Sequence, residues 1–170
     1  PTTLPDAPSV PGVTRVAAFA RGDFTNTIQH ATNSIAKNPW QEDSRVLHIR
    51  ALMAQGQFAE AHTVTTNAMA KLASSVRVRW AAHEVFHFNN DPKGATNALA
   101  EINRLAGIRG WAYRNTPDLI VLGRTALKLN ADPKLVLDKL YHPAREHDPN
   151  FAGTAQAIGD LAFFYHSVNE

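Results

Sequence analysis

Three turn sequences recur at 34-residue intervals along this chain, and their spacing limits the fold more than any other feature. Gly22-Asp23-Phe24 and Gly56-Gln57-Phe58 are alike, and Asn90-Asp91-Pro92 follows after the same interval. In the third turn, Asp91 suits a helix N-cap and Pro92 suits the first helical position. A period of about 20 to 50 residues is typical of chains built from stacked repeats. The spacing therefore predicts a scaffold that presents a surface.

The pattern of apolar and small residues predicts an all-α fold. These residues recur at intervals of three and four between short turns, and no segment reads convincingly as a strand. Asp132-Pro133 repeats the pairing of a cap with a proline, and Pro143 predicts a kink or break in the helix that follows. We expect nine helices, at residues 13–21, 24–37, 43–55, 58–72, 76–88, 92–106, 117–129, 133 onward and 150–166.

The chain divides on composition into an arm and a helical domain. Residues 1–12 carry four prolines, which predicts an extended arm or linker. Residues 13–170 then form one repeat domain. Its period breaks at an insertion near 107–116, which holds two glycines. The aromatic residues of this insertion, Trp111 and Tyr113, are expected either to cover a helix pair or to form a contact patch.

Composition excludes several classes of function. The formal net charge of the 170 residues is +2, with no run of like charges, so the chain lacks the footprint of a nucleic-acid binder. No apolar run approaches the roughly 18 residues of a membrane span. The absence of cysteine excludes disulfides and thiolate metal sites. It leaves the compartment open, because a cytosol and an oxidising periplasm or secreted setting both suit such a chain.

On these residues the chain resembles the tetratricopeptide repeat family, over about residues 13–170. Gly123 and Gly159 stand at the family's small position in a fourth and a fifth repeat, whereas bulky His83 stands there in the third. The resemblance implies a right-handed superhelix of about four helical hairpins plus a terminal helix. It also implies a protein-interaction scaffold and not an enzyme. The best-matched positions of the first two repeats are Gly22, Asp23, Phe24, Pro39, Gly56, Phe58, Ala61 and Ala68.

The last helix has no partner helix, so it is either a natural cap or the edge of a piece cut from a longer array. The stretch 122–138 is similar to segments of large bacterial repeat proteins, which favours the second alternative. An exposed apolar face on this helix predicts homodimer contacts if no further repeat follows. That face consists of Phe151, Ile158, Leu161 and Phe164.

The resemblance also implies a concave groove that binds a peptide or a neighbouring domain. Apolar anchoring by Met53, Trp80 and Phe88, with Arg50, Arg124 and Lys128 holding a carboxylate, predicts an acidic partner. The carboxylate-clamp pattern of chaperone-binding repeats is absent. In the alternative interpretation, Trp80 packs against a neighbouring helix instead. The expected groove residues are Arg50, Met53, Trp80, Glu84, His87, Arg124 and Lys128.

One segment matches a catalytic motif. His83-Glu84-Val85-Phe86-His87 reads H-E-x-x-H, in which two histidines of a helix hold zinc and the glutamate is the general base. The usual third ligand is missing, because Asn90 and Lys93 stand where the extended motif has glycine and histidine. A zinc hydrolase is therefore the alternative function, with His83 and His87 as metal candidates. Otherwise we expect no cofactor. A third alternative is a structural spacer whose groove is filled by residues 1–12.

Overall fold

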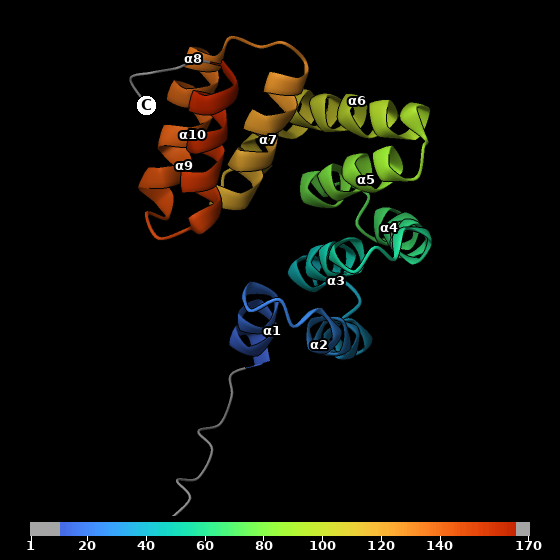
Figure 1. Ribbon diagram of the computed structural model, residues 1–170. Coiled ribbons are helices and arrows are strands. Elements are labelled where there is room, and N and C mark those ends of the chain that lie inside the picture. The colour runs from blue at the N-terminus through green and yellow to red at the C-terminus, as the bar shows by residue number, and fades with distance from the viewer. Residues whose placement is uncertain (1–10, 166–170) are drawn as a thin grey trace, which may run out of the picture. The chain divides into compact units, whose positions relative to one another are not determined.

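A computed structural model describes residues 11–165 of the chain, with side chains from residue 16 onward. Every regular element in this range is helical and no strand occurs in it, which confirms the all-α prediction (Figure 1). Among these residues, no helix combines the length and the apolar character that a membrane crossing requires. The arm predicted at residues 1–12 lies outside the described range up to residue 10. Pro11 and Gly12 already belong to the first helix, because proline is tolerated in a first helical turn.

Short-range signals place most helix ends within two residues of the prediction. Counting the interrupted helix 133–147 once, the described residues hold nine α-helices. The bounds are α1 Pro11–Ala20, α2 Phe24–Lys37, α3 Glu42–Ala54, α4 Phe58–Lys71, α5 Val76–Phe88, α6 Pro92–Arg109, α7 Thr116–Lys128, α8 Pro133–Val136, α9 His142–His147 and α10 Ala152–Tyr165.

The segment between α6 and α7 differs from the predicted insertion. Helix α6 continues to Arg109, so Gly107 lies inside it, and a short 3₁₀ turn η1 (Gly110–Ala112) follows. Tyr113 is buried among apolar residues of α5, α6 and α7, and its hydroxyl donates to the Ser74 carbonyl at 2.8 Å. Trp111 is 70% exposed. One aromatic residue of this segment therefore covers a helix pair and the other faces solvent.

The chain forms two compact units, Pro1–Ala73 and Ser74–Glu170. In the first unit, α1 packs on α2, α2 on α3 and α3 on α4. Its core is built largely from small residues, with Ile49 and Leu52 as the largest side chains that are fully buried. In the second unit, α5 and α6 form a hairpin, and α7 packs against both. A single array over 13–170 stays a prediction.

The first helix of each hairpin ends in the same backbone turn. The second residue after the helix adopts a left-handed conformation at Gly22, Gly56, Asn90 and Asn130, with φ of 76°, 72°, 55° and 63°. In each case the next amide donates to a carbonyl five residues back, as Asp23 does to Ala18 at 2.9 Å. This is the Schellman pattern, and glycine and asparagine are the residues that adopt its left-handed conformation most readily. The first three turns are separated by the predicted interval of 34 residues, and the fourth follows after 40 residues.

Small buried residues recur at the same interval in the second helix of each hairpin. Thr27, Ala61 and Ala95 occupy the equivalent buried place in α2, α4 and α6. Ala31 and Thr65 are buried one turn further along. A small side chain lets two helix backbones approach closely, so the repeated spacing in the sequence becomes repeated packing in the fold.

The helix after α7 does not break at Pro143, where the sequence predicted a kink or a break. It runs from α8 into α9 through a π-helical turn, η2 (Leu137–Tyr141), where the amide of His142 donates to the Leu137 carbonyl. Proline lacks the amide hydrogen and crowds the carbonyl four residues earlier. The wider turn just before Pro143 relieves that crowding, so the helix continues.

The terminal helix is partly buried, which corrects the prediction of an exposed apolar face. It covers Ala152–Tyr165, and residue 166 lies outside the described range. Leu161 is fully buried against α7 and η2, and Phe151 and Ile158 pack against the same cluster. Phe164 remains exposed. Most of this face is therefore used inside the second unit, because α10 supplies the cover that α7 and η2 need.

Candidate functional site

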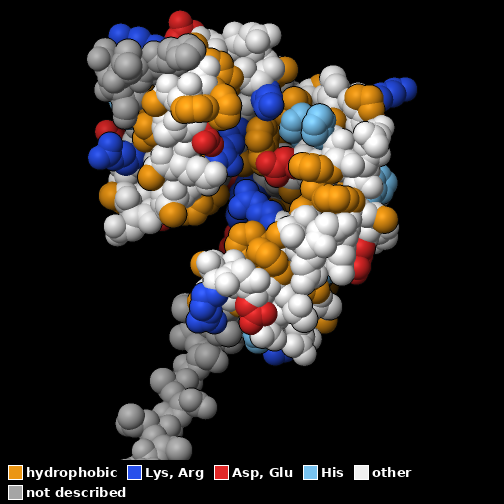
Figure 2. All heavy atoms as spheres, in the orientation of Figure 1, with side chains coloured by type: hydrophobic (Ala, Val, Ile, Leu, Met, Phe, Trp, Pro, Cys, Tyr) orange, Lys and Arg blue, Asp and Glu red, His pale blue; other side chains and the backbone are white. Residues whose placement is uncertain are grey.

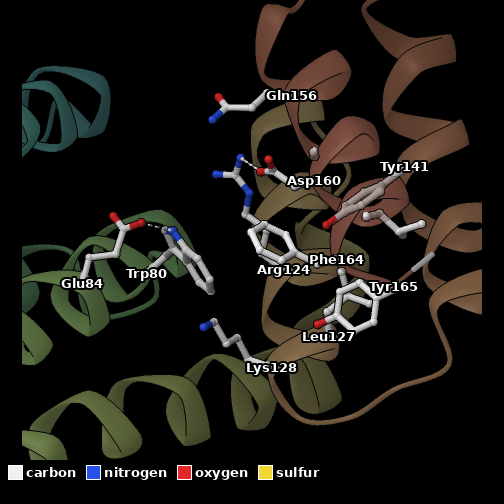
Figure 3. A pocket seen from close by; sticks show the side chains of 12 residues that line it. Trp80, Glu84, Arg124, Leu127, Lys128, Tyr141, Gln156, Asp160, Phe164 and Tyr165 are labelled. Atoms are coloured by element: carbon white, nitrogen blue, oxygen red, sulfur yellow. Dashed lines mark hydrogen bonds and ion pairs between the residues drawn. The ribbon is translucent and has the colours of Figure 1, made fainter. Parts of the chain in front are cut away.

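The second unit contains a hollow of about 510 Å³ between α5, α7, η2 and α10 (Figure 3). This volume lies within the usual range of ligand pockets, about 300 to 1,000 Å³. In Figure 2, basic, acidic and apolar side chains meet around this hollowed part of the surface. The residues that line it are Trp80, Glu84, Arg124, Leu127, Lys128, Tyr141, Gln156, Ala157, Asp160, Leu161, Phe164 and Tyr165.

Helix α5 contributes an aromatic wall. Trp80 is only 6% exposed and packs with Leu99, Ile102 and Tyr113, yet it also borders the hollow. Its indole Nε1 donates to Oε1 of Glu84, one turn along the helix, at 3.1 Å. This bond satisfies the buried indole and gives the Glu84 carboxylate a fixed partner. Trp80 therefore packs against neighbouring helices, as the alternative interpretation predicted, and it also borders the hollow, whereas its role in binding stays a prediction.

Helix α7 contributes two cations. Arg124 and Lys128 are four residues apart, so they project from the same face of the helix. An Arg124 guanidinium nitrogen, Nη2, lies 3.7 Å from Oδ2 of Asp160 on α10, which makes an ion pair but not a hydrogen bond. No described residue forms a hydrogen bond or an ion pair with the exposed Lys128 ammonium.

The floor of the hollow is the ring of Tyr141, at the end of the π turn. The residue is 1% exposed. A Cβ at position 123 would overlap Cε1 of this ring and lie 2.8 Å from its Cζ. Gly123 therefore makes the room in which the Tyr141 ring lies over α7. The family resemblance marked Gly123 as a small position, and the ring above it supplies the physical reason.

The electrostatics of the floor keep the Tyr141 hydroxyl protonated. Burial is the main cause that raises the pKa of Tyr141 to about 12; Arg124 opposes this shift, and Asp160 contributes to it. At neutral pH this group is therefore a hydrogen-bond donor. Figure 3 shows the hydroxyl at the end of the ring that faces the hollow. No described residue forms a hydrogen bond with it.

Sequence reasoning missed the contribution of α10. Gln156, Asp160 and Phe164 are spaced four residues apart, so they share one face of the helix, and all three line the hollow. The exposed fractions of the neighbouring Phe163 and Phe164 are 76% and 69%, but only Phe164 lines it. The spacing was visible in the sequence. Which face of α10 meets α7 was not.

The structure brings only part of the predicted groove together. Trp80, Glu84, Arg124 and Lys128 line the hollow. His87 is exposed at the end of α5, where its ring lies 6.0 Å from that of Phe88 and not in the hollow. The remaining two, Arg50 and Met53, lie on α3 in the first unit, exposed and half-buried respectively.

The H-E-x-x-H segment is engaged in packing contacts. Nδ1 of His83 lies 3.1 Å from the Ala95 carbonyl oxygen, and its ring lies 5.5 Å from that of Trp80. Since a carbonyl only accepts, Nδ1 carries the proton in this contact. Glu84 is bonded to the same tryptophan. Over the described part of the chain, no three His, Cys, Asp or Glu side chains gather as a metal site would require.

Comparisons with known proteins do not indicate a function for this chain, so the geometry of the hollow is the basis of the proposal below. Neither a scan of protein-family models nor a search of curated proteins found a match to this chain.

Proposed function

We propose that this chain is a protein-interaction scaffold of the tetratricopeptide type, and that the hollow of its second unit binds a segment of a partner protein. The observation that carries the proposal is the lining of the hollow. It joins aromatic side chains to polar groups that have weak partners or none among the described residues. On this proposal the protein is not an enzyme, and the hairpins form a right-handed superhelix.

The repeated turn supports the tetratricopeptide part of the proposal. Gly22, Gly56 and Asn90 adopt the same left-handed conformation 34 residues apart, and each is followed by the same five-residue backbone bond. Such an interval with one helical hairpin per repeat is typical of this class of solenoid. Within the second unit, α5 also contacts α7, which places the first helices of successive hairpins side by side.

The chemistry of the lining supports the binding part. Trp80, Phe164 and Tyr165 give the hollow aromatic surface, and aromatic residues dominate the energetics of many protein interfaces. The exposed ring of Phe164 gains most from being covered, since 69% of its surface faces solvent. Arg124 and Lys128 add charge at the same place, which would orient a bound segment.

Panning of a random peptide library on the chain tests this function. The enriched peptides would be synthesised, and their Kd measured by fluorescence anisotropy with the wild type and two variants. Phe164→Ala should weaken binding about tenfold, because it removes an aromatic contact from the hollow. Phe163→Ala is the matched control, since it removes an equally exposed ring that does not line the hollow. Equal effects of the two variants, or no enriched peptide, would refute the proposal.

A further inference from the structure

We infer that the hollow recognises one acidic side chain of the bound segment. The carboxylate of that side chain accepts hydrogen bonds from the Tyr141 hydroxyl and the Arg124 guanidinium, and it replaces Asp160 as the partner of Arg124. This inference rests on the proposed function and specifies its ligand. In this inference, Asp160 competes with the ligand carboxylate for the Arg124 guanidinium. It also predicts that an apolar residue neighbours the acidic one, against Trp80 and Phe164.

The Tyr141 hydroxyl is the strongest reason to expect an acceptor in the ligand. The side chain is 1% exposed, and its hydroxyl has no hydrogen-bond partner among the described residues. The residue borders the hollow, so a ligand that enters it can reach the hydroxyl. The group is a donor over the whole neutral range, since burial raises its pKa to about 12. A ligand oxygen at the floor of the hollow would satisfy it.

The Arg124 guanidinium is the second donor, and its present partner holds it weakly. The distance of 3.7 Å between Arg124 Nη2 and Asp160 Oδ2 is longer than that of a charge-assisted hydrogen bond, which is about 2.7 to 2.9 Å. Asp160 has 49% of its side chain exposed, so solvent screens the pair. A guanidinium can bind a carboxylate through two parallel hydrogen bonds. A ligand carboxylate that reaches the floor can therefore replace Asp160 with better geometry.

The other charges of the hollow favour an acid over a base. Glu84 already accepts the Trp80 indole hydrogen, and Asp160 already faces Arg124. Lys128, one turn from Arg124, has no partner among the residues that the structure describes. The charged group of the hollow without a hydrogen-bond or ion-pair partner among these residues is thus the Lys128 ammonium, which attracts a carboxylate at the rim.

One residue pair makes the test specific. Tyr141→Phe removes the hydroxyl but keeps the ring that packs over Gly123, so the fold of the hollow is retained. Asp160→Asn removes the competing charge from an exposed side chain at nearly constant volume. The two substitutions should move the affinity for an acidic peptide in opposite directions. A merely structural role would not produce that result.

The probes are the peptides enriched by panning, synthesised as C-terminal amides in pairs that differ by Glu→Gln or Asp→Asn. With the wild-type chain, the acidic member should bind about tenfold tighter. Tyr141→Phe and Arg124→Gln should each weaken the acidic member about fivefold or more and leave the neutral one unchanged. Asp160→Asn should strengthen the acidic member about threefold. Lys128→Gln should weaken it, whereas Lys139→Gln, an exposed lysine outside the hollow, should not. Circular dichroism checks that each variant is folded.

Failure of this inference can be told apart from failure of the proposed function. Binding that is lost in Phe164→Ala but is equal for acidic and neutral peptides keeps the function and refutes the carboxylate anchor. The anchor is also refuted if only peptides with a free C-terminus bind, since the carboxylate would then come from the chain end. Weaker acidic binding in Asp160→Asn would refute the exchange. Binding that is insensitive to Phe164→Ala refutes the function itself.

Discussion

Replacing Gly123 by alanine should destabilise the second unit, against the ordinary expectation for a helix. Gly123 lies within α7, and an alanine inside a helix is more stable than a glycine by about 1 kcal/mol. Propensity alone therefore predicts a gain.

The packing around Gly123 reverses that sign. The new Cβ would overlap Cε1 of Tyr141 and lie 2.8 Å from Cζ and 3.0 Å from Cδ1. The atoms in the way belong to a rigid aromatic ring that is 1% exposed, so they cannot move into solvent. Overpacking of this kind costs about 1 to 3 kcal/mol. Subtracting the gain in propensity leaves a net loss of up to about 2 kcal/mol.

Urea unfolding followed by circular dichroism measures this change as a shift of the midpoint at constant slope. Gly159→Ala in α10 is the matched control. It lies inside a helix, and no atom comes within 4 Å of its added Cβ, so it should stabilise the chain by up to about 1 kcal/mol. The reasoning is refuted if Gly123→Ala is as stable as the wild type or more so.

A double-mutant cycle assigns the loss to the ring. Tyr141→Ala in the Gly123→Ala background should cost less than the sum of the two single changes, because the clash needs both partners. Gly123→Ala should also weaken peptide binding, since the displaced ring forms the floor of the hollow. Additive effects would show that the alanine acts elsewhere.

Three further outcomes follow from the described residues. Asn90→Ala should lose about 1 kcal/mol in urea unfolding because φ is 55° there, whereas Asn90→Gly should lose none. Burial lowers the pKa of His48; Glu60 opposes this shift, and Arg45 adds a smaller lowering effect. The free energy of unfolding should therefore fall as the pH drops below about 6.5. His48→Gln should make the free energy of unfolding less dependent on pH in this range. The raised pKa of Tyr141 means that its stabilising contribution is complete below about pH 10. About 2 kcal/mol should be lost between pH 10 and 12, and Tyr141→Phe should remove that loss.

The candidate site was predictable only in part, and particular residues show why. Arg124 and Lys128 share a face of one helix, so the sequence could place them together. Arg50 and Met53 were joined to them only through the family resemblance, and they lie in the other unit. Asp160 escaped notice, and Phe164 was assigned to a dimer face and not to the hollow, because no local pattern says which face of α10 packs on α7.

The amino-acid sequence by itself determined the helices and the turns between them. Glycine or asparagine after a helix and the caps at Asp91 and Asp132 are local signals, since each acts on backbone groups a few residues away. Tertiary structure alone decided the hollow. The π turn before Pro143 carries the Tyr141 ring over Gly123, and α10 closes the opposite side. These contacts join residues far apart in the chain, so they depend on how whole helices pack rather than on any short pattern.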